Sequence, residues 1–192
     1  MPFIEIPSYI YQIWAMDTCS GDPSLLITSR QTNLGHSKSL TIWKLPNQTK
    51  EDIANENNRE NDAIAHEDDC LEMKELVTFS QSVKPGITTC LKWHPTKQQS
   101  LLSVDNHILS LWDIKDNARV SQIGGLILDN DQEFYSGTTS WDPHSPSSCC
   151  VAANTRIMLV DTRNDMEITA ENKKAHGDAI RDIDYNPNKP LV

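Results

Sequence analysis

Apolar and polar residues alternate along the chain in short segments separated by polar turns, a pattern typical of β-strands. The clearest group consists of four segments in a row: residues 86–93, 100–104, 107–114 and 118–123. The two middle segments are almost continuously apolar, which predicts strands covered on both faces. The fourth segment is mostly polar and predicts an edge strand. Together they predict one antiparallel four-stranded sheet.

The same order of segments occurs before and after this group. The preceding segments are 11–18, 25–29, 39–45 and 73–79, and the following ones are 134–141, 148–153, 156–163 and 166–171. Trp93 and Trp141 are 48 residues apart, and Trp141 and Tyr185 are 44 apart. A four-stranded propeller blade repeats every ~40–45 residues. We therefore expect an all-β fold in which residues 1–192 form a partial β-propeller. It would contain about three blades and the first strand of a further blade, which leaves the ring incomplete.

One interval in this series is too long. Trp43 and Trp112 are 69 residues apart, and the excess lies in residues 47–70. This segment has eight acidic residues, two basic ones and no aromatic residue. Such a composition cannot bury enough apolar surface to offset the entropy of ordering. We predict a disordered acidic loop inserted within one blade. The segment lacks the ligand spacing of a calcium loop, so a solvated spacer or a partner-facing tail is the favoured interpretation.

Composition excludes several classes of function. The net charge of −10 and the absence of a basic run argue against nucleic-acid binding. No apolar stretch approaches the ~20 residues that cross a bilayer, so membrane insertion is not expected. The five cysteines have no metal-ligand or redox spacing, which favours reduced thiols in the cytosol. We find no Gly-rich phosphate loop and no arrangement of nucleophile and base. The sequence therefore predicts no enzyme activity, no cofactor and no metal site.

Aromatic residues mark the ends of the predicted strands. Trp93, Trp141 and Tyr185 each stand two residues before a proline, the last of these being Pro187. The third predicted strands close on Trp43, on Trp112-Asp113 and on Val160-Asp161, and His176 precedes the last aromatic turn. His94 and His144 flank two of the turns, where they either share a ligand or are exposed to solvent. The motifs resemble those of the WD-repeat family, which implies a closed β-propeller and a structural histidine hydrogen-bonded to Ser or Thr. For His176 those partners would lie beyond Val192, and a role as a base or ligand is the less favoured alternative.

A closer resemblance covers nearly the whole chain. It is carried by AHGDAIRDIDYNPNKP (175–190), DNHILSLWDI (105–114), VDTR (160–163) and the acidic insert after TIWKLP (41–46). These stretches resemble WD-repeat proteins that interact with the endosome-associated recycling (EARP) and Golgi-associated retrograde (GARP) tethering complexes. The resemblance implies a non-catalytic cytoplasmic adaptor at the trans-Golgi network and endosomes that supports endosomal recycling and retrograde transport. It also implies a fragment, since members are about twice this length. A fragment with open sheet faces at both ends is expected to aggregate.

Two other functions stay open at this point. Residues 160–163 resemble the Trp-Asp-x-Arg box through which some propellers dock on the adaptor of cullin-type ubiquitin ligases, with Arg163 as the partner contact. The competing interpretation pairs Arg163 with Asp161 or Asp165 on the same surface, an arrangement that contributes little to stability. In the second alternative, the chain is a truncated fragment without function.

Overall fold

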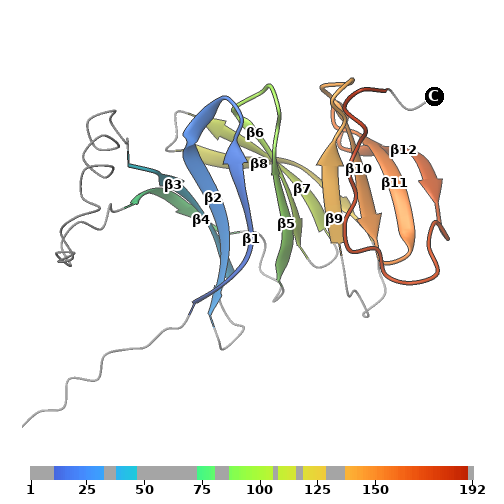
Figure 1. The fold of residues 1–192 in the computed structure, drawn as a ribbon, viewed down its shortest axis with the longest axis horizontal. Helices are drawn as coiled ribbons and strands as arrows, with labels where there is room; N and C mark the ends of the chain where they lie inside the picture. The colour runs from blue at the N-terminus through green and yellow to red at the C-terminus, as the bar shows by residue number, and fades with distance from the viewer. Residues whose placement is uncertain are drawn as a thin grey trace, which may run out of the picture.

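The computed structural model describes residues 11–32, 38–46, 73–80, 87–105, 108–115, 119–128 and 137–189, and these form twelve strands and no helix (Figure 1). The first sheet contains β1 (Tyr11–Cys19), β2 (Asp22–Thr32), β3 (Lys38–Lys44) and β4 (Lys74–Phe79). The second contains β5 (Thr88–Trp93), β6 (Ser100–Asp105), β7 (Ile108–Lys115) and β8 (Arg119–Ile127). The third contains β9 (Gly137–Trp141), β10 (Ser148–Ala153), β11 (Arg156–Asp161) and β12 (Glu167–Asn172).

Each sheet is an antiparallel meander with its strands in chain order. The first strands lie against one another, since β1 contacts β5 and β5 contacts β9. Successive sheets are therefore joined at their inner strands, and the three sheets follow one another from β1 to β12 in Figure 1. The predicted all-β class and the three four-stranded sheets are confirmed.

All three outer strands carry a β-bulge at the same place. The register shifts between Ile42 and Trp43 in the β3–β4 pair, and between Leu111 and Trp112 in the β7–β8 pair. It shifts again between Leu159 and Val160 in the β11–β12 pair. A bulge bends a strand and increases its twist. The repeated position shows that the three sheets are copies of one unit, even where Val160 replaces tryptophan.

The core consists of two apolar layers between neighbouring sheets. Ile27 and Ile42 of the first sheet pack on Leu101 and Trp112 of the second. The opposite face of the second sheet packs on the third through a set that includes Leu102, Leu109, Leu111, Val151 and Val160. Strands β6 and β7 are thus buried on both faces, and β8 is mostly exposed. This pattern confirms the two middle strands and the edge strand that the sequence predicts for the second sheet.

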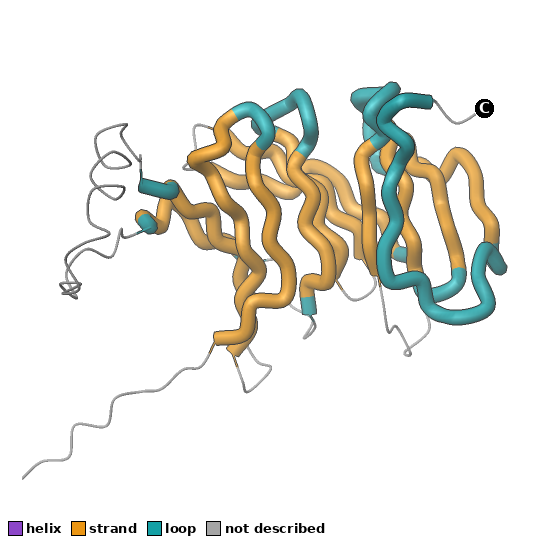
Figure 2. Tube along the Cα trace, in the orientation of Figure 1, coloured by secondary structure: helices purple, strands orange, loops and turns teal. Residues whose placement is uncertain are grey.

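The C-terminal segment corrects one prediction. Residues 173–189 contain no strand, although the sequence predicts the first strand of a further blade around Tyr185. Figure 2 shows this segment as a loop. It is joined to the third sheet by a backbone hydrogen bond from Ile180 N to Asn154 O (2.7 Å) and by side-chain hydrogen bonds to β9. A segment without a ladder of backbone hydrogen bonds is not a strand. Strand β8 also extends to Ile127, four residues beyond its predicted end. The acidic insert at 47–70 lies outside the described residues.

Candidate protein-interaction surface

The inner strands bring equivalent residues of the repeat side by side. Leu26 pairs with both Thr18 and Trp43, and Leu101 pairs with both Trp93 and Trp112. In the third sheet Cys149 pairs with Trp141 and Val160 in the same way. The residue before each of Thr18, Trp93, Trp141 and Tyr185 is polar. This row comprises Asp17, Lys92, Ser140 and, in the C-terminal segment, Asp184.

Hydrogen bonds join this row across the sheet boundaries. The backbone N–H of Trp93 donates to Asp17 Oδ2 (2.6 Å), and the indole Nε1 of Trp141 donates to the carbonyl of Lys92 (3.0 Å). Ser140 Oγ donates to Asp184 Oδ1 at 2.8 Å. The first two bonds tie β1 to β5 and β5 to β9, and the third ties β9 to the C-terminal segment, so the row is fixed by packing between neighbouring elements.

The turns after the aromatic residues are built alike. The residue that follows each aromatic accepts a hydrogen bond from a backbone N–H two residues further on, an arrangement that stabilises tight turns. Asp142 accepts from His144 N (2.8 Å), Asn186 from Asn188 N (2.9 Å), and His94 from Thr96 N (3.0 Å). His94 therefore takes the place that Asp or Asn takes in the other two turns.

His94 is buried, contrary to both of its predicted roles as a shared ligand or a solvent-exposed side chain. Its ring packs on Trp141 with centroids 4.4 Å apart. Nδ1 accepts hydrogen bonds from the backbone, so Nε2 carries the proton and donates to the carbonyl of Pro146 (2.9 Å). Burial lowers the pKa of His94. The histidine is a neutral structural residue. His144, by contrast, is exposed, as predicted for a loop-tip histidine.

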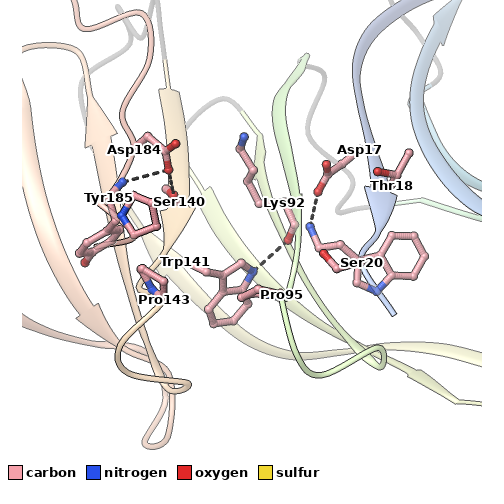
Figure 3. A pocket seen from close by; sticks show the side chains of 12 residues that line it. Asp17, Thr18, Ser20, Lys92, Pro95, Ser140, Trp141, Pro143, Asp184 and Tyr185 are labelled. Atoms are coloured by element: carbon pink, nitrogen blue, oxygen red, sulfur yellow. Dashed lines mark hydrogen bonds between the residues drawn. The ribbon is translucent and has the colours of Figure 1, made fainter. Parts of the chain in front are cut away.

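The polar row and the turns enclose a cleft of about 330 Å³. Figure 3 shows Asp17 and Asp184 on opposite sides of it, with Lys92 and Trp141 between them. The lining also includes Tyr185 and an exposed proline from each of the three turns: Pro95, Pro143 and Pro187. Burial raises the pKa of Asp17, against the opposing effect of the Trp93 N–H. The cleft offers carboxylates beside apolar rings, which suits a cationic or polar group on an extended protein segment.

The tryptophans of the third strands, Trp43 of β3 and Trp112 of β7, have structural roles. Trp112 Nε1 donates to Ser103 Oγ (2.8 Å), and Trp43 Nε1 donates to Thr28 Oγ1 (2.9 Å). In the third sheet Val160 replaces the tryptophan, and Val151 stands at the position of the hydroxyl residue. Both polar partners are therefore lost together, which leaves no buried indole N–H unpaired at this site. Asp113, next to Trp112, lies 3.4 Å from the ammonium of Lys115 at the surface.

His176 and Arg163 do not join the cleft. His176 is exposed, and its Nδ1 lies 3.2 Å from the backbone N of Asp178. Arg163 is paired with Asp161, with Nη2 2.5 Å from Oδ2 and Nε 3.0 Å from Oδ1. Hydrogen bonds from Arg163 lower the pKa of Asp161 to about 2. The guanidinium thus has the intramolecular partner that the competing interpretation expects, and docking on a ubiquitin-ligase adaptor stays a prediction.

Sequence reasoning missed the polar row. Asp17, Lys92, Ser140 and Asp184 differ in chemical type, so no motif marks them. The available signal is positional, because three of them directly precede the aromatic of an aromatic-x-Pro turn. Repeat position therefore predicts Lys92, Ser140 and Asp184, but not Asp17, which precedes Thr18.

The described residues show no grouping that suits a metal or a membrane. No three His, Cys, Asp or Glu side chains among them gather closely enough to hold a metal ion. They include no helix with the length and apolarity that crossing a lipid bilayer requires. Four cysteines, at positions 19, 90, 149 and 150, are free and buried. Burial raises the pKa of Cys149 to about 12 and that of Cys150 to about 11, so both are protonated thiols.

The fold resembles that of solved β-propeller structures. A crystal structure of Sqt1 from Chaetomium thermophilum superimposes with a TM-score of 0.54 at 9% identity, covering 85% of this chain and 36% of that one. A crystal structure of Hsv2 from Kluyvelomyces marxianus gives a TM-score of 0.54 at 13% identity, covering 85% of this chain and 46% of that one. These similarities establish the fold. No protein-family profile matches the chain.

Similar sequences carry names that refer to tethering complexes. The human protein "EARP and GARP complex-interacting protein 1" is 30% identical over 187 residues, which cover 93% of this chain and 45% of that protein. The Danio rerio "EARP-interacting protein homolog" is 27% identical over the same shares of both chains. This chain therefore spans less than half the length of these relatives.

Proposed function

We propose that this chain is a non-catalytic adaptor that binds subunits of EARP- and GARP-type tethering complexes in the cytoplasm. Through this binding it supports endosomal recycling and endosome-to-Golgi retrograde transport, at the surface of the trans-Golgi network and endosomes. The single observation that carries the proposal is sequence similarity over 93% of the chain to proteins named for interaction with these complexes.

The geometry of the described residues supports a binding role. The polar and aromatic side chains of the repeat are engaged in holding strands and turns together, as the Trp112–Ser103 and His94–Pro146 hydrogen bonds illustrate. A rigid sheet array of this kind presents loops and strand ends to partners without contributing chemistry.

We assign partner contact to the cleft between Asp17 and Asp184. Its two carboxylates flank a single Lys92, so the lining favours a cationic residue of the partner. The three exposed prolines at the mouth add rigid apolar surface on which an extended segment can pack. A short basic segment of a tethering subunit fits this combination.

Co-purification of the tagged chain from cells tests the proposal, with immunoblots for the tethering subunits. We expect the wild type to recover them and Asp184→Lys to lose most of this recovery. The matched control is Asp178→Lys, which changes an exposed aspartate of the same segment outside the cleft lining. A wild-type chain that recovers no tethering subunit rejects the function. Equal recovery by both variants keeps the function and rejects the cleft as the contact.

A further inference from the structure

Among the described outer strands, the second half of β8 has the least charged edge. Strand β8 is the last strand of its sheet, and no other described strand pairs with its outer side. Residues 122–127, QIGGLI, contain no charge, whereas β4 begins with Lys74 and Glu75, and β12 carries Glu167 and Glu171. Charged residues on an edge strand oppose pairing with another chain. The second half of β8 lacks that protection.

The exposed side chains of β8 form an apolar stripe. Ile123 is 55% exposed and Ile127 is 63% exposed. Gly125 lies between them, and a Cβ there would meet only the end of the Gln122 side chain at 3.0 Å. Gly124 has the opposite environment, since a Cβ there would lie 3.0 Å from Met166 of the neighbouring sheet. At residues 123–127, one face of β8 is thus fixed by packing and the other is exposed.

This stripe is complementary to itself. An antiparallel pair of β8 strands centred on Gly125 brings the bulge at Gln122 and Ile123 of each copy opposite Ile127 of the other, with the two glycines facing at the centre. Apolar side chains that meet across an antiparallel ladder are favourable, and a two-fold contact uses the same patch on both copies. We propose that the chain pairs with a second copy of itself through β8, which joins two four-stranded sheets into one.

The equivalent strands of the other sheets do not have this property. Gly125 pairs with Ser110, two residues before Trp112, and Thr78 of β4 pairs with Thr41, two residues before Trp43. The equivalent residue of β12 is Glu171, which would face Glu171 of its own copy. Like charges directly opposite each other are destabilising. Pairing through β8 also leaves the cleft at the inner strands open in both copies.

Sedimentation velocity over a range of protein concentrations tests the proposal. We expect a reversible monomer–dimer equilibrium for the wild type, and for Ile127→Lys a dissociation constant at least about tenfold higher. The matched control is Met16→Lys, because Met16 of β1 is 62% exposed on a different face. A wild type that stays monomeric overturns the proposal. Loss of the dimer in Met16→Lys, with retention in Ile127→Lys, overturns it as well.

Disulfide trapping locates the two-fold axis of the proposed dimer by a measurement that does not depend on the stability of the dimer. In a Cys70→Ser background, Gly125→Cys places two thiols directly opposite each other, where Cβ atoms lie ~4.5–5.5 Å apart, close to disulfide range. The four described cysteines are buried. The control is Thr78→Cys, the register equivalent on β4. We expect mild oxidation to cross-link Gly125→Cys several-fold faster. Equal rates for the two variants overturn the β8 contact.

Discussion

The sheets β1–β4 and β5–β8 present equivalent residues on corresponding faces, but in different surroundings. In the second sheet Leu91 is 2% exposed and Trp112 is 4% exposed, because the first sheet covers them. Their equivalents in the first sheet are Met16, which is 62% exposed, and Trp43, which is half-buried. Trp43 packs against the Arg30 guanidinium, 5.1 Å from the ring centroid. The first sheet therefore has the side-chain pattern of a covered face without a neighbour among the described residues.

This difference distinguishes the interactions made within one sheet from those that depend on the neighbouring sheet. The indole–hydroxyl hydrogen bond is made within one sheet, and it is present in both the covered and the open sheet. Burial of the same tryptophan depends on the next sheet. Stability in such arrays is a sum of terms within repeats and between neighbours, and this pair of sheets allows the two to be measured apart.

Truncation of Trp112 and Trp43 should give the largest difference in stability between the covered and the open sheet. We expect Trp112→Ala to lower the free energy of unfolding by about 3–5 kcal/mol, because a buried indole is lost between two sheets. Trp43→Ala should cost about 1–2 kcal/mol, because only part of its surface is removed from water. Urea denaturation followed by circular dichroism measures both. Equal losses would show that the open face contributes as much as the covered one.

Removal of the hydroxyl partner sharpens the comparison. Ser103→Ala leaves the buried Trp112 N–H without its acceptor and should cost about 1–3 kcal/mol. Thr28→Ala should cost less than about 1 kcal/mol, since water can reach the half-exposed indole of Trp43. The variants Ser103→Thr and Thr28→Ser retain a hydroxyl and serve as controls. A larger loss for Thr28→Ala than for Ser103→Ala contradicts this account.

The turn at His94 tests the other boundary, between the second and third sheets. Burial lowers the pKa of His94 from its usual 6.5, so the unfolded chain binds the proton more readily than the folded one. Stability is fully present above pH 6.5 and declines as the pH falls toward the folded pKa. His94→Asn keeps an acceptor, as Asn186 shows, and should flatten this decline. Thermal melts at a series of pH values below 6.5 measure this decline for the wild type and for His94→Asn. The same dependence of melting temperature on pH in both proteins would exclude His94 as the titrating group.

The smallest effect on stability is expected for the Arg163–Asp161 ion pair, which lies away from the packed faces of the sheets. The Arg163–Asp161 pair lies at the surface, and the Arg163 side chain is 71% exposed. Exposed ion pairs contribute little to stability. Arg163→Ala should leave the melting temperature unchanged within error while the variants above shift it. A clear decrease would show that the end of β11 contributes more to the third sheet than its exposure suggests.

The strand pattern was predictable because it depends on local alternation and on turn residues. The two continuously apolar strands of the second sheet, β6 and β7, are confirmed as its middle strands. The C-terminal segment was predicted wrongly because IDYNP has the strand pattern, but a strand also requires a ladder partner. The local sequence shows the strand pattern, but it does not show whether a partner strand is present.

The candidate cleft was predictable only in part. The aromatic-x-Pro turns of Trp93, Trp141 and Tyr185 were found from sequence, and the structure brings them to one cleft. The carboxylates were missed, because Asp17 and Asp184 come together through the stacking of sheets and not through spacing within one. His94 was unpredictable for a related reason, since its burial depends on Trp141 from the next sheet.

The adjacent thiols of β10 have a practical consequence for following motion in this protein. Cys149 belongs to the layer against the second sheet, whereas Cys150 lies beside Tyr185 of the C-terminal segment. A thiol reagent would modify Cys149 only when the second and third sheets separate, and Cys150 when the terminal segment lifts. The modification rates of these two neighbouring residues would therefore report separately on the opening of two contacts: the one between the second and third sheets, and the one between the third sheet and the C-terminal segment.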